Sequence, residues 1–273
     1  MLRTQAPVTP AFRPLRLYFV LAFAITWIAG GLALVLNAYG IGPPLSSTHP
    51  LYFVAGWGPS VAGIAVTAAM AGTPGVRELF SRMIPRRSDA GWYALVLAGF
   101  PVVTMTVAAV GFHQPFPSWA AIGAAFATLP ATLFLDTGPL GEEIGWRGFA
   151  LPQMLRRGTP MVTAVELGII WGAWHLPTFY ISTLTQSRLS LPLFIVNTTA
   201  VSVIMTWLYL RTRGDLLLMV LIHLMANFCA GALNVSFKAE TVAEAFVAAA
   251  ILVMGGVERR MRTGSPIEHR ERQ

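Results

Sequence analysis

Charged residues are scarce in this chain, and four long stretches lack them altogether. Asp, Glu, Lys and Arg make up only 11% of the 273 residues, whereas a typical soluble domain contains about 25%. The stretches without any of them are residues 17–76, 90–135, 189–210 and 216–237. A helix that crosses a bilayer needs about 20 consecutive apolar residues. The composition therefore excludes an ordinary soluble domain and predicts an all-α polytopic membrane protein.

Cysteine is nearly absent too, since Cys229 is the only one in the chain. A single cysteine excludes an intramolecular disulfide framework. Cys229 lies within an apolar run, where a small buried hydrophobic residue is expected. The first apolar run begins near Leu17 and is longer than the core of a signal peptide, which predicts an uncleaved first span.

The apolar runs predict about eight transmembrane spans, near residues 15–38, 51–72, 91–112, 118–157, 160–181, 190–210, 214–234 and 241–256. A membrane domain of residues 15–256 then lies between an N-terminal tail, 1–14, and a C-terminal tail, 257–273. The fourth span is too long for one straight crossing, because 40 helical residues extend about 60 Å. We therefore expect a bend at Gly138-Pro139, with Asp136 as a helix cap.

Basic residues are distributed very unevenly across this topology. Of the 19 Lys and Arg residues, 17 fall on the side that holds both tails, and only Arg188 and Lys238 fall on the other. Basic loops tend to stay on the cytoplasmic side of a membrane. The pattern predicts a multi-pass protein of the cell membrane with both termini in the cytoplasm. The net charge of +7 comes from basic residues in these loops and tails, where they meet anionic lipid headgroups. Nucleic acid is therefore not an expected partner.

The stretch Gly141–Gly148 brings three charges, Glu142, Glu143 and Arg147, into apolar surroundings. A charge at mid-bilayer costs about 2.5–3.5 kcal/mol on insertion scales, so it needs a partner and usually has a function. Glu143 precedes Arg147 by four residues, the favourable order for an ion pair on a helix. Glu142 points about 100° away from Glu143 and is left for a separate role. The competing interpretation is a charged cap near a helix end.

Two later segments each carry an aligned polar pair. Trp171 and His175 are four residues apart, as are His223 and Asn227, so each pair shares one helix face. Counted from the loops, Glu142 and His175 lie about 24 Å along their helices at 1.5 Å per residue. The His223 and Asn227 pair reaches a similar depth. The sequence therefore predicts one polar layer shared by the fourth, fifth and seventh spans.

The order of these motifs resembles the CPBP family, which comprises type II CAAX prenyl endopeptidases and bacterial bacteriocin-processing and self-immunity (Abi) proteins. The resemblance rests on Glu-Glu-x-x-x-Arg, aromatic-x-x-x-His and His-x-x-x-Asn on successive helices, over about residues 120–235. The stretch Gly141–Gly148 and the Trp-His-Leu-Pro at 174–177 are very similar to bacterial members. Trp171 stands where the family usually has Phe. The resemblance implies an eight-helix intramembrane endopeptidase with a cavity open to the cytoplasm.

The same resemblance implies a role for each polar residue of the layer. Glu142 would be the general base that activates water, with His175 beside it. His223 and Asn227 would position the substrate carbonyl and stabilise the oxyanion. Three further residues would support them: Glu143, Arg147 and Trp171. No cofactor is expected, and the implied partners are the lipid bilayer and a membrane-associated peptide or protein.

A zinc site competes with this interpretation, because two histidines and a carboxylate can leave a fourth position for water. Its ligands would be Glu142, His175 and His223. The sequence contains no His-Glu-x-x-His motif, and we favour the metal-free mechanism. Two other functions stay open. One is a proton-coupled transporter, in which buried Glu and His relay protons, and the other is a non-catalytic immunity protein that sequesters a peptide.

Overall fold

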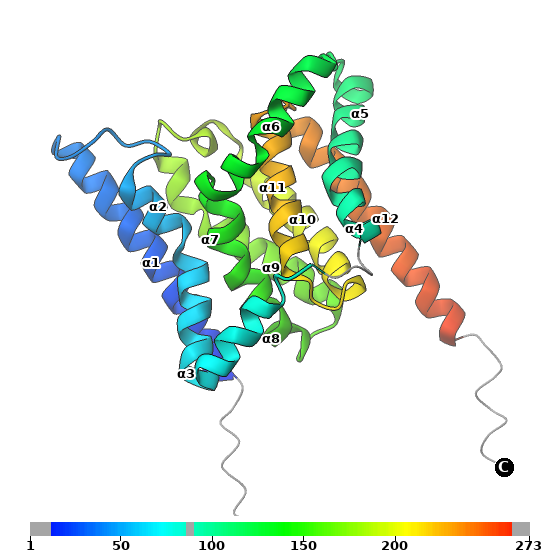
Figure 1. Ribbon diagram of the computed structural model, residues 1–273, viewed down its shortest axis with the longest axis horizontal. Helices are drawn as coiled ribbons and strands as arrows, with labels where there is room; N and C mark the ends of the chain where they lie inside the picture. The colour runs from blue at the N-terminus through cyan, green and yellow to red at the C-terminus, as the bar shows by residue number, and fades with distance from the viewer. Residues whose placement is uncertain (1–11, 86–89, 264–273) are drawn as a thin grey trace, which may run out of the picture.

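The computed structural model describes residues 12–85 and 90–263, and all regular structure in these two ranges is helical (Figure 1). The elements before the central bend are α1 (Phe12–Ala38), α2 (Pro50–Gly56), α3 (Gly58–Ser81), α4 (Ala90–Ala94), the π-helical turn η2 (Leu95–Gly99), α5 (Phe100–Phe112) and α6 (Trp119–Leu135). Those after it are α7 (Thr137–Gly145), the π-helical turn η3 (Trp146–Ala150), α8 (Leu151–Leu155), α9 (Pro160–Trp174), the 3₁₀ turns η4 (Leu176–Tyr180) and η5 (Thr185–Arg188), α10 (Leu191–Arg211), α11 (Leu216–Gly231) and α12 (Phe237–Thr263).

The helices support a multi-pass membrane protein. Within residues 12–85 and 90–263, three helical stretches are long and apolar enough to cross a membrane alone: Pro14–Ala38, Ala90–Phe112 and Leu191–Arg211. Two bent pairs pass the same test as units, α2 with α3, bent by 51°, and α6 with residues Thr137–Leu155, bent by 52°. Length and composition alone thus give three to five spans. The expected number of eight crossings stays a prediction.

The expected bend in the fourth span lies at Asp136, two residues earlier than predicted. Asp136 ends α6 and is the N-cap of α7, where its Oδ1 accepts a hydrogen bond from the Gly138 amide at 2.9 Å. Pro139 falls in the first turn of α7, where backbone N–H groups have no partner inside the helix. The proline is therefore tolerated there, and the chain bends at the capping residue instead.

The fifth expected span, residues 160–181, is shorter as a helix than predicted. α9 ends at Trp174, and His175 is its C-cap. Pro177 follows two residues later, and a proline at that distance favours the end of a helix. A 3₁₀ turn, η4, then continues to Tyr180. His175 consequently lies at a helix end, where its side chain faces a cavity.

Glycines on α7 and α9 allow two unusually close helix contacts. A Cβ atom at Gly168 would lie 2.6 Å from the Thr199 Cα atom of α10. On α7, a Cβ atom at Gly145 would collide with the carbonyl oxygen of Pro59, at the start of α3. Small residues let helix backbones approach closely inside membranes. These contacts fix α7 and α9 in the interior, where they carry the polar motifs.

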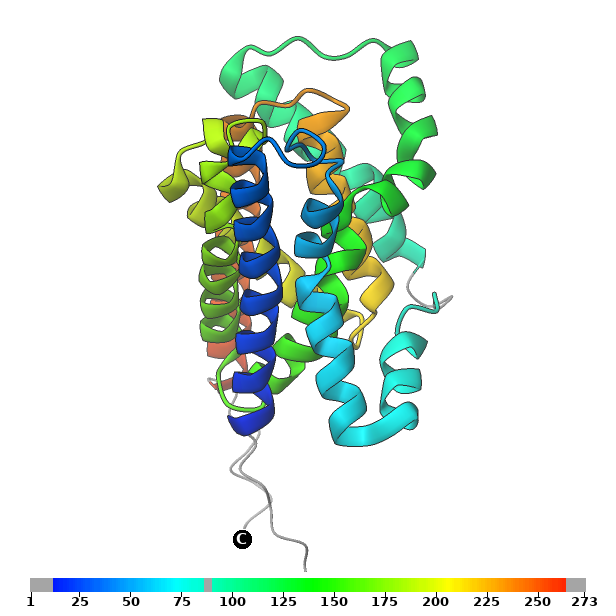
Figure 2. The ribbon, with the colours of Figure 1, turned by 90° about the vertical axis from the view of Figure 1, so that its left-hand side faces the viewer.

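The chain ends and the connections between helices lie at two opposite ends of the molecule. Both described chain ends point to the same end, and we name it the terminal end (Figures 1 and 2). The connections 156–159 and 212–215 belong to that end. The connections 39–49, 113–118, 175–190 and 232–236 lie at the other, which we name the loop end.

Candidate active site

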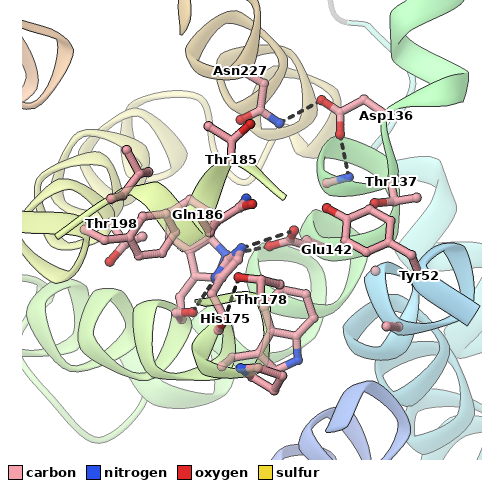
Figure 3. A pocket seen from close by; sticks show the side chains of 18 of the residues that line it. Tyr52, Asp136, Thr137, Glu142, His175, Thr178, Thr185, Gln186, Thr198 and Asn227 are labelled. Atoms are coloured by element: carbon pink, nitrogen blue, oxygen red, sulfur yellow. Dashed lines mark hydrogen bonds and ion pairs between the residues drawn. The ribbon is translucent and has the colours of Figure 1, made fainter. Parts of the chain in front are cut away.

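A pocket of about 350 Å³ lies among α1, α2, α7, α9, α10, α11 and α12 (Figure 3). Its wall includes Glu142, His175, His223 and Asn227, the four residues predicted as catalytic. They come from α7, the end of α9, and α11. The structure thus brings the polar residues of three separate helices to one cavity.

The Glu142 carboxylate is almost fully buried, with 4% of its surface exposed. One oxygen, Oε2, accepts a hydrogen bond from the Trp171 indole Nε1 at 2.5 Å. The other oxygen, Oε1, lies 3.8 Å from His175 Nε2. Glu142 is therefore held on one side and faces His175 on the other.

The His175 ring is oriented by its own helix. Its Nδ1 lies 2.9 Å from the carbonyl oxygen of Trp171, one turn earlier. Because a carbonyl oxygen only accepts, the hydrogen of this bond belongs to Nδ1. In the neutral ring Nε2 is then an acceptor, and this atom is the one that points toward Glu142.

His223 pairs with Glu143, a contact that the sequence analysis did not predict. His223 Nδ1 lies 2.7 Å from Glu143 Oε1. The predicted pair is also present, since Arg147 Nη1 donates to both Glu143 oxygens at 2.8 and 3.0 Å, with both side chains fully buried. Glu143 therefore links Arg147 to the pocket. The sequence gives the faces of α7 alone and not how another helix packs on them, and α11 packs against α7 where it can reach Glu143.

Trp171 contacts Glu142 and also the two partners of Glu143. Its Nε1 donates to Glu142, and the Arg147 guanidinium carbon lies 4.5 Å from the centre of its ring. The ring also meets His223 edge-on, with centroids 5.2 Å apart. A Phe at this position could pack in the same way, but it has no N–H to donate. Sequence reasoning assigned Trp171 a supporting role and missed its hydrogen bond.

Asn227 is anchored by Asp136, which the sequence identified only as a cap. Asn227 Nδ2 donates to Asp136 Oδ2 at 2.7 Å, while the other oxygen of Asp136 caps α7 (Figure 3). A carboxylate has two oxygens, so a cap inside an apolar region leaves one that still needs a donor. The second oxygen of a capping Asp in an apolar run was thus the feature of the sequence that could have predicted this contact.

The first turn of α7 also touches the pocket through Gly138. A Cβ atom there would lie 2.9 Å from His223 Nε2 and 3.1 Å from Asn227 Nδ2. These two nitrogens are therefore neighbours, and both approach the backbone at the start of α7. Because glycine has no side chain, this position leaves space for both nitrogens.

A second acidic group on α12 was missed by sequence reasoning. Glu240 lines the pocket and is buried, with 3% exposed. Glu244, one turn later, is 1% exposed, and its Oε2 accepts a hydrogen bond from Asn197 on α10 at 2.5 Å. The sequence feature that could have revealed this group is a pair of acids four residues apart in the last apolar run. Acids in apolar surroundings were the reason for singling out Gly141–Gly148 as well.

The zinc hypothesis concerns Glu142, His175 and His223, which line one pocket. Across residues 12–85 and 90–263, no three His, Cys, Asp or Glu side chains are grouped so that they could hold a metal ion. Both histidines use Nδ1 for a protein oxygen, which leaves Nε2 of each ring for other partners. The metal-free mechanism therefore stays a prediction, and we derive no step through a metal.

Comparison with known proteins covers the part of the chain that carries these residues. Residues 124–229 match the family described as type II CAAX prenyl endopeptidase Rce1-like. CAAX prenyl protease 2 of Methanococcus maripaludis is 26% identical over 113 residues, or 38% of this chain and 42% of that protein. Over this segment the chain is similar to that family, and the match supports the resemblance to the CPBP family. The aligned segment spans less than half of the relative's length, and the bacterial affiliation stays a prediction.

The CPBP match contains the central polar residues but only part of the pocket wall. It begins within α6 and ends within α11, so it includes Glu142, His175, His223 and Asn227. α1, α2 and α12 lie outside it, yet they contribute Thr26, Tyr52 and Glu240 to the pocket. The shape of the cavity therefore depends on helices that the CPBP match does not cover.

Proposed function

We propose that this protein is an intramembrane endopeptidase that hydrolyses a peptide bond in a membrane-associated peptide or protein. One observation carries the proposal. A buried carboxylate, Glu142, is fixed by Trp171 and presents its second oxygen to His175 Nε2 inside a pocket. A carboxylate held in this way, beside a histidine, has the geometry of a general base. The name of the matched relative, a CAAX prenyl protease, supports the same bond type.

In the proposed mechanism, a water molecule binds between Glu142 and His175. The 3.8 Å between Oε1 and Nε2 is too long for a direct hydrogen bond, but one water can bond to both atoms. Glu142 takes a proton from this water, and the water oxygen attacks the carbonyl carbon of the substrate. The proton then moves to the nitrogen of the leaving amine as the C–N bond breaks.

His223 and Asn227 would stabilise the oxyanion formed in that attack. When the His223 ring is protonated, both of its nitrogens donate, Nδ1 to Glu143 and Nε2 into the pocket. Asn227 uses one hydrogen of its amide for Asp136 and keeps a second. Donors that are fixed in place stabilise a developing negative charge more strongly than mobile water does. Glu143, Arg147 and Trp171 would position the reacting groups without touching the substrate.

The proposal is tested by the peptides that the protein produces. Membrane-associated peptides from cells with the wild-type protein and with Glu142→Ala should differ at their termini when compared by mass spectrometry. Truncated termini present in the wild type should be missing in the variant, and the uncut precursors should accumulate. A His223→Ala strain serves as a second loss-of-function sample. Identical termini in all three strains would contradict proteolysis and favour a non-catalytic peptide-binding protein.

The proposed chemistry uses no metal, and this leads to a separate prediction. Activity of the purified protein should be unchanged after prolonged treatment with a strong zinc chelator, because no proposed step passes through a metal. The measurement is the cleavage rate of a substrate found by mass spectrometry, before and after chelation. A known zinc protease treated in parallel provides the control. A loss that added zinc restores would overturn the metal-free mechanism and revive the set Glu142, His175 and His223.

A further inference from the structure

The pocket reaches the surface at the loop end. Its wall includes residues in or beside the connections of that end: Leu45, Thr185, Gln186, Leu189, Gly231 and Phe237. By contrast, no residue of the connections 82–85, 156–159 or 212–215 contributes to it. Figures 1 and 2 place the connections of the loop end away from both chain ends. The cavity therefore opens at the end of the molecule opposite to the described chain ends, near residues 12 and 263.

The basic residues lie at the terminal end, where the pocket does not open. Exposed arginines there are Arg16, Arg77, Arg156, Arg157, Arg211 and Arg213. Among the described residues, the loop end has only two exposed basic side chains, Arg188 and Lys238. Arg147 does not belong to this comparison, because it is buried against Glu143. The difference in charge remains large without it, and the positive-inside rule assigns the terminal end to the cytoplasm.

Exposed aromatic side chains mark the other membrane boundary. Trp119, Tyr39, Tyr180 and Phe116 belong to the loop end, with 89%, 78%, 73% and 58% of their surfaces exposed. Aromatic residues are enriched at both interfaces between a membrane and water, whereas the excess of arginine belongs to the cytoplasmic loops alone. The aromatic residues thus place a membrane boundary at the loop end, and the arginines decide which boundary is cytoplasmic.

The depth of Glu142 agrees with an opening at the loop end. Glu142 lies 14 residues before Arg156 along α7, η3 and α8, which corresponds to about 21 Å of helix. The hydrocarbon core of a bilayer is about 30 Å thick. Glu142 is therefore about 10 Å from the boundary at the loop end. A substrate that enters from that end has the shorter path.

We propose that the pocket opens on the extracytoplasmic face of the membrane and receives its substrate from there. The part that concerns the substrate rests on the proposed function, whereas the orientation does not. The substrate class would be an exported or membrane-anchored peptide whose scissile segment lies at the outer surface. A cavity open to the cytoplasm, which the family resemblance implied, is incompatible with cytoplasmic termini in this structure.

Cysteine labelling tests the orientation, and the single buried Cys229 makes the experiment clean. In a Cys229→Ala background, one cysteine is introduced at a time: Thr185→Cys in the pocket wall, Ser47→Cys at the loop end and Ser81→Cys at the terminal end. Spheroplasts are treated with a membrane-impermeant maleimide before or after permeabilisation. Before permeabilisation, the two cysteines of the loop end should react at least tenfold more than the one introduced at Ser81.

Two outcomes would overturn the proposed orientation. One is the reverse pattern, in which only the cysteine at Ser81 reacts in intact spheroplasts. The other is equal reaction of all three while a cytosolic marker protein stays unlabelled. Labelling requires no catalysis, so an inactive protein with the expected pattern would refute the peptidase proposal alone. If peptides are cut, their new termini should map to outward-facing segments, and termini in cytoplasmic segments would refute extracytoplasmic entry.

Discussion

A Glu142→Gln protein is expected to keep its fold and to lose proteolytic activity by a factor of about 10²–10⁴, the usual contribution of a general base. Glutamine has nearly the same size as glutamate, and its amide oxygen can still accept the hydrogen bond from Trp171 Nε1. It cannot take a proton from water. The substitution therefore removes the proposed chemistry and leaves the contact that holds the side chain.

The matched control is Glu166→Gln, the same change at an exposed position on α9 that does not line the pocket. Its cleavage rate should stay within about twofold of the wild type, because surface substitutions away from a site have small effects. Cleavage rates in detergent and thermal unfolding would be measured for both variants. A Glu142→Gln protein that keeps more than a tenth of the wild-type rate would remove Glu142 from the mechanism.

The largest expected effect on stability comes from Arg147. Replacing it with Met leaves the buried Glu143 carboxylate without the guanidinium and with His223 as its remaining partner, and breaking a buried ion pair in this way costs about 3–5 kcal/mol. Both side chains of the pair are 0% exposed, so water cannot replace the lost partner. The loss should appear as a lower free energy of unfolding in detergent.

Two further variants separate the lost ion pair from other effects of the substitution. Arg156→Met removes an exposed arginine whose hydrogen bond is to Gln153 at 3.3 Å, and it should cost less than about 1 kcal/mol. The double variant Arg147→Met/Glu143→Gln should be more stable than Arg147→Met alone, because no uncompensated charge stays buried. Equal losses in Arg147→Met and Arg156→Met would mean that the buried pair contributes nothing to the fold.

Much of the architecture could be predicted because lipid leaves little choice of secondary structure. A backbone in hydrocarbon must satisfy its own hydrogen bonds, so long apolar runs become helices. The ends of those helices were harder to place. The bend depended on whether Asp136 capped α7 or Pro139 broke it, and the end of α9 depended on Pro177. Such local competitions are decided by capping and packing, which the hydropathy pattern does not describe.

The meeting of the four residues and the pair of Glu143 with Arg147 were predictable from the sequence, but the partners of His223 and Asn227 were not. Counting residues along helices put Glu142, His175, His223 and Asn227 near one level, and the structure brings them to one pocket. The partner of His223 could not be derived, because the rotation of α11 relative to α7 is set by packing between helices. For the same reason, the contact between Asn227 and Asp136 appears only in the folded protein.

The π-helical turn η3 determines how the two halves of one helix are phased. A π-helix bonds each residue to the fifth along the chain instead of the fourth, so the turn over Trp146–Ala150 contains one residue more than an α-helix would need. If the same five residues were wound as an α-helix, α7 would be turned by about 100° relative to α8, the rotation of one residue. Glu142 and Glu143 would then turn away from Trp171 and His223, although no site residue had changed. The winding of η3 thus sets the alignment of the two acids, independently of the side chains that form the site.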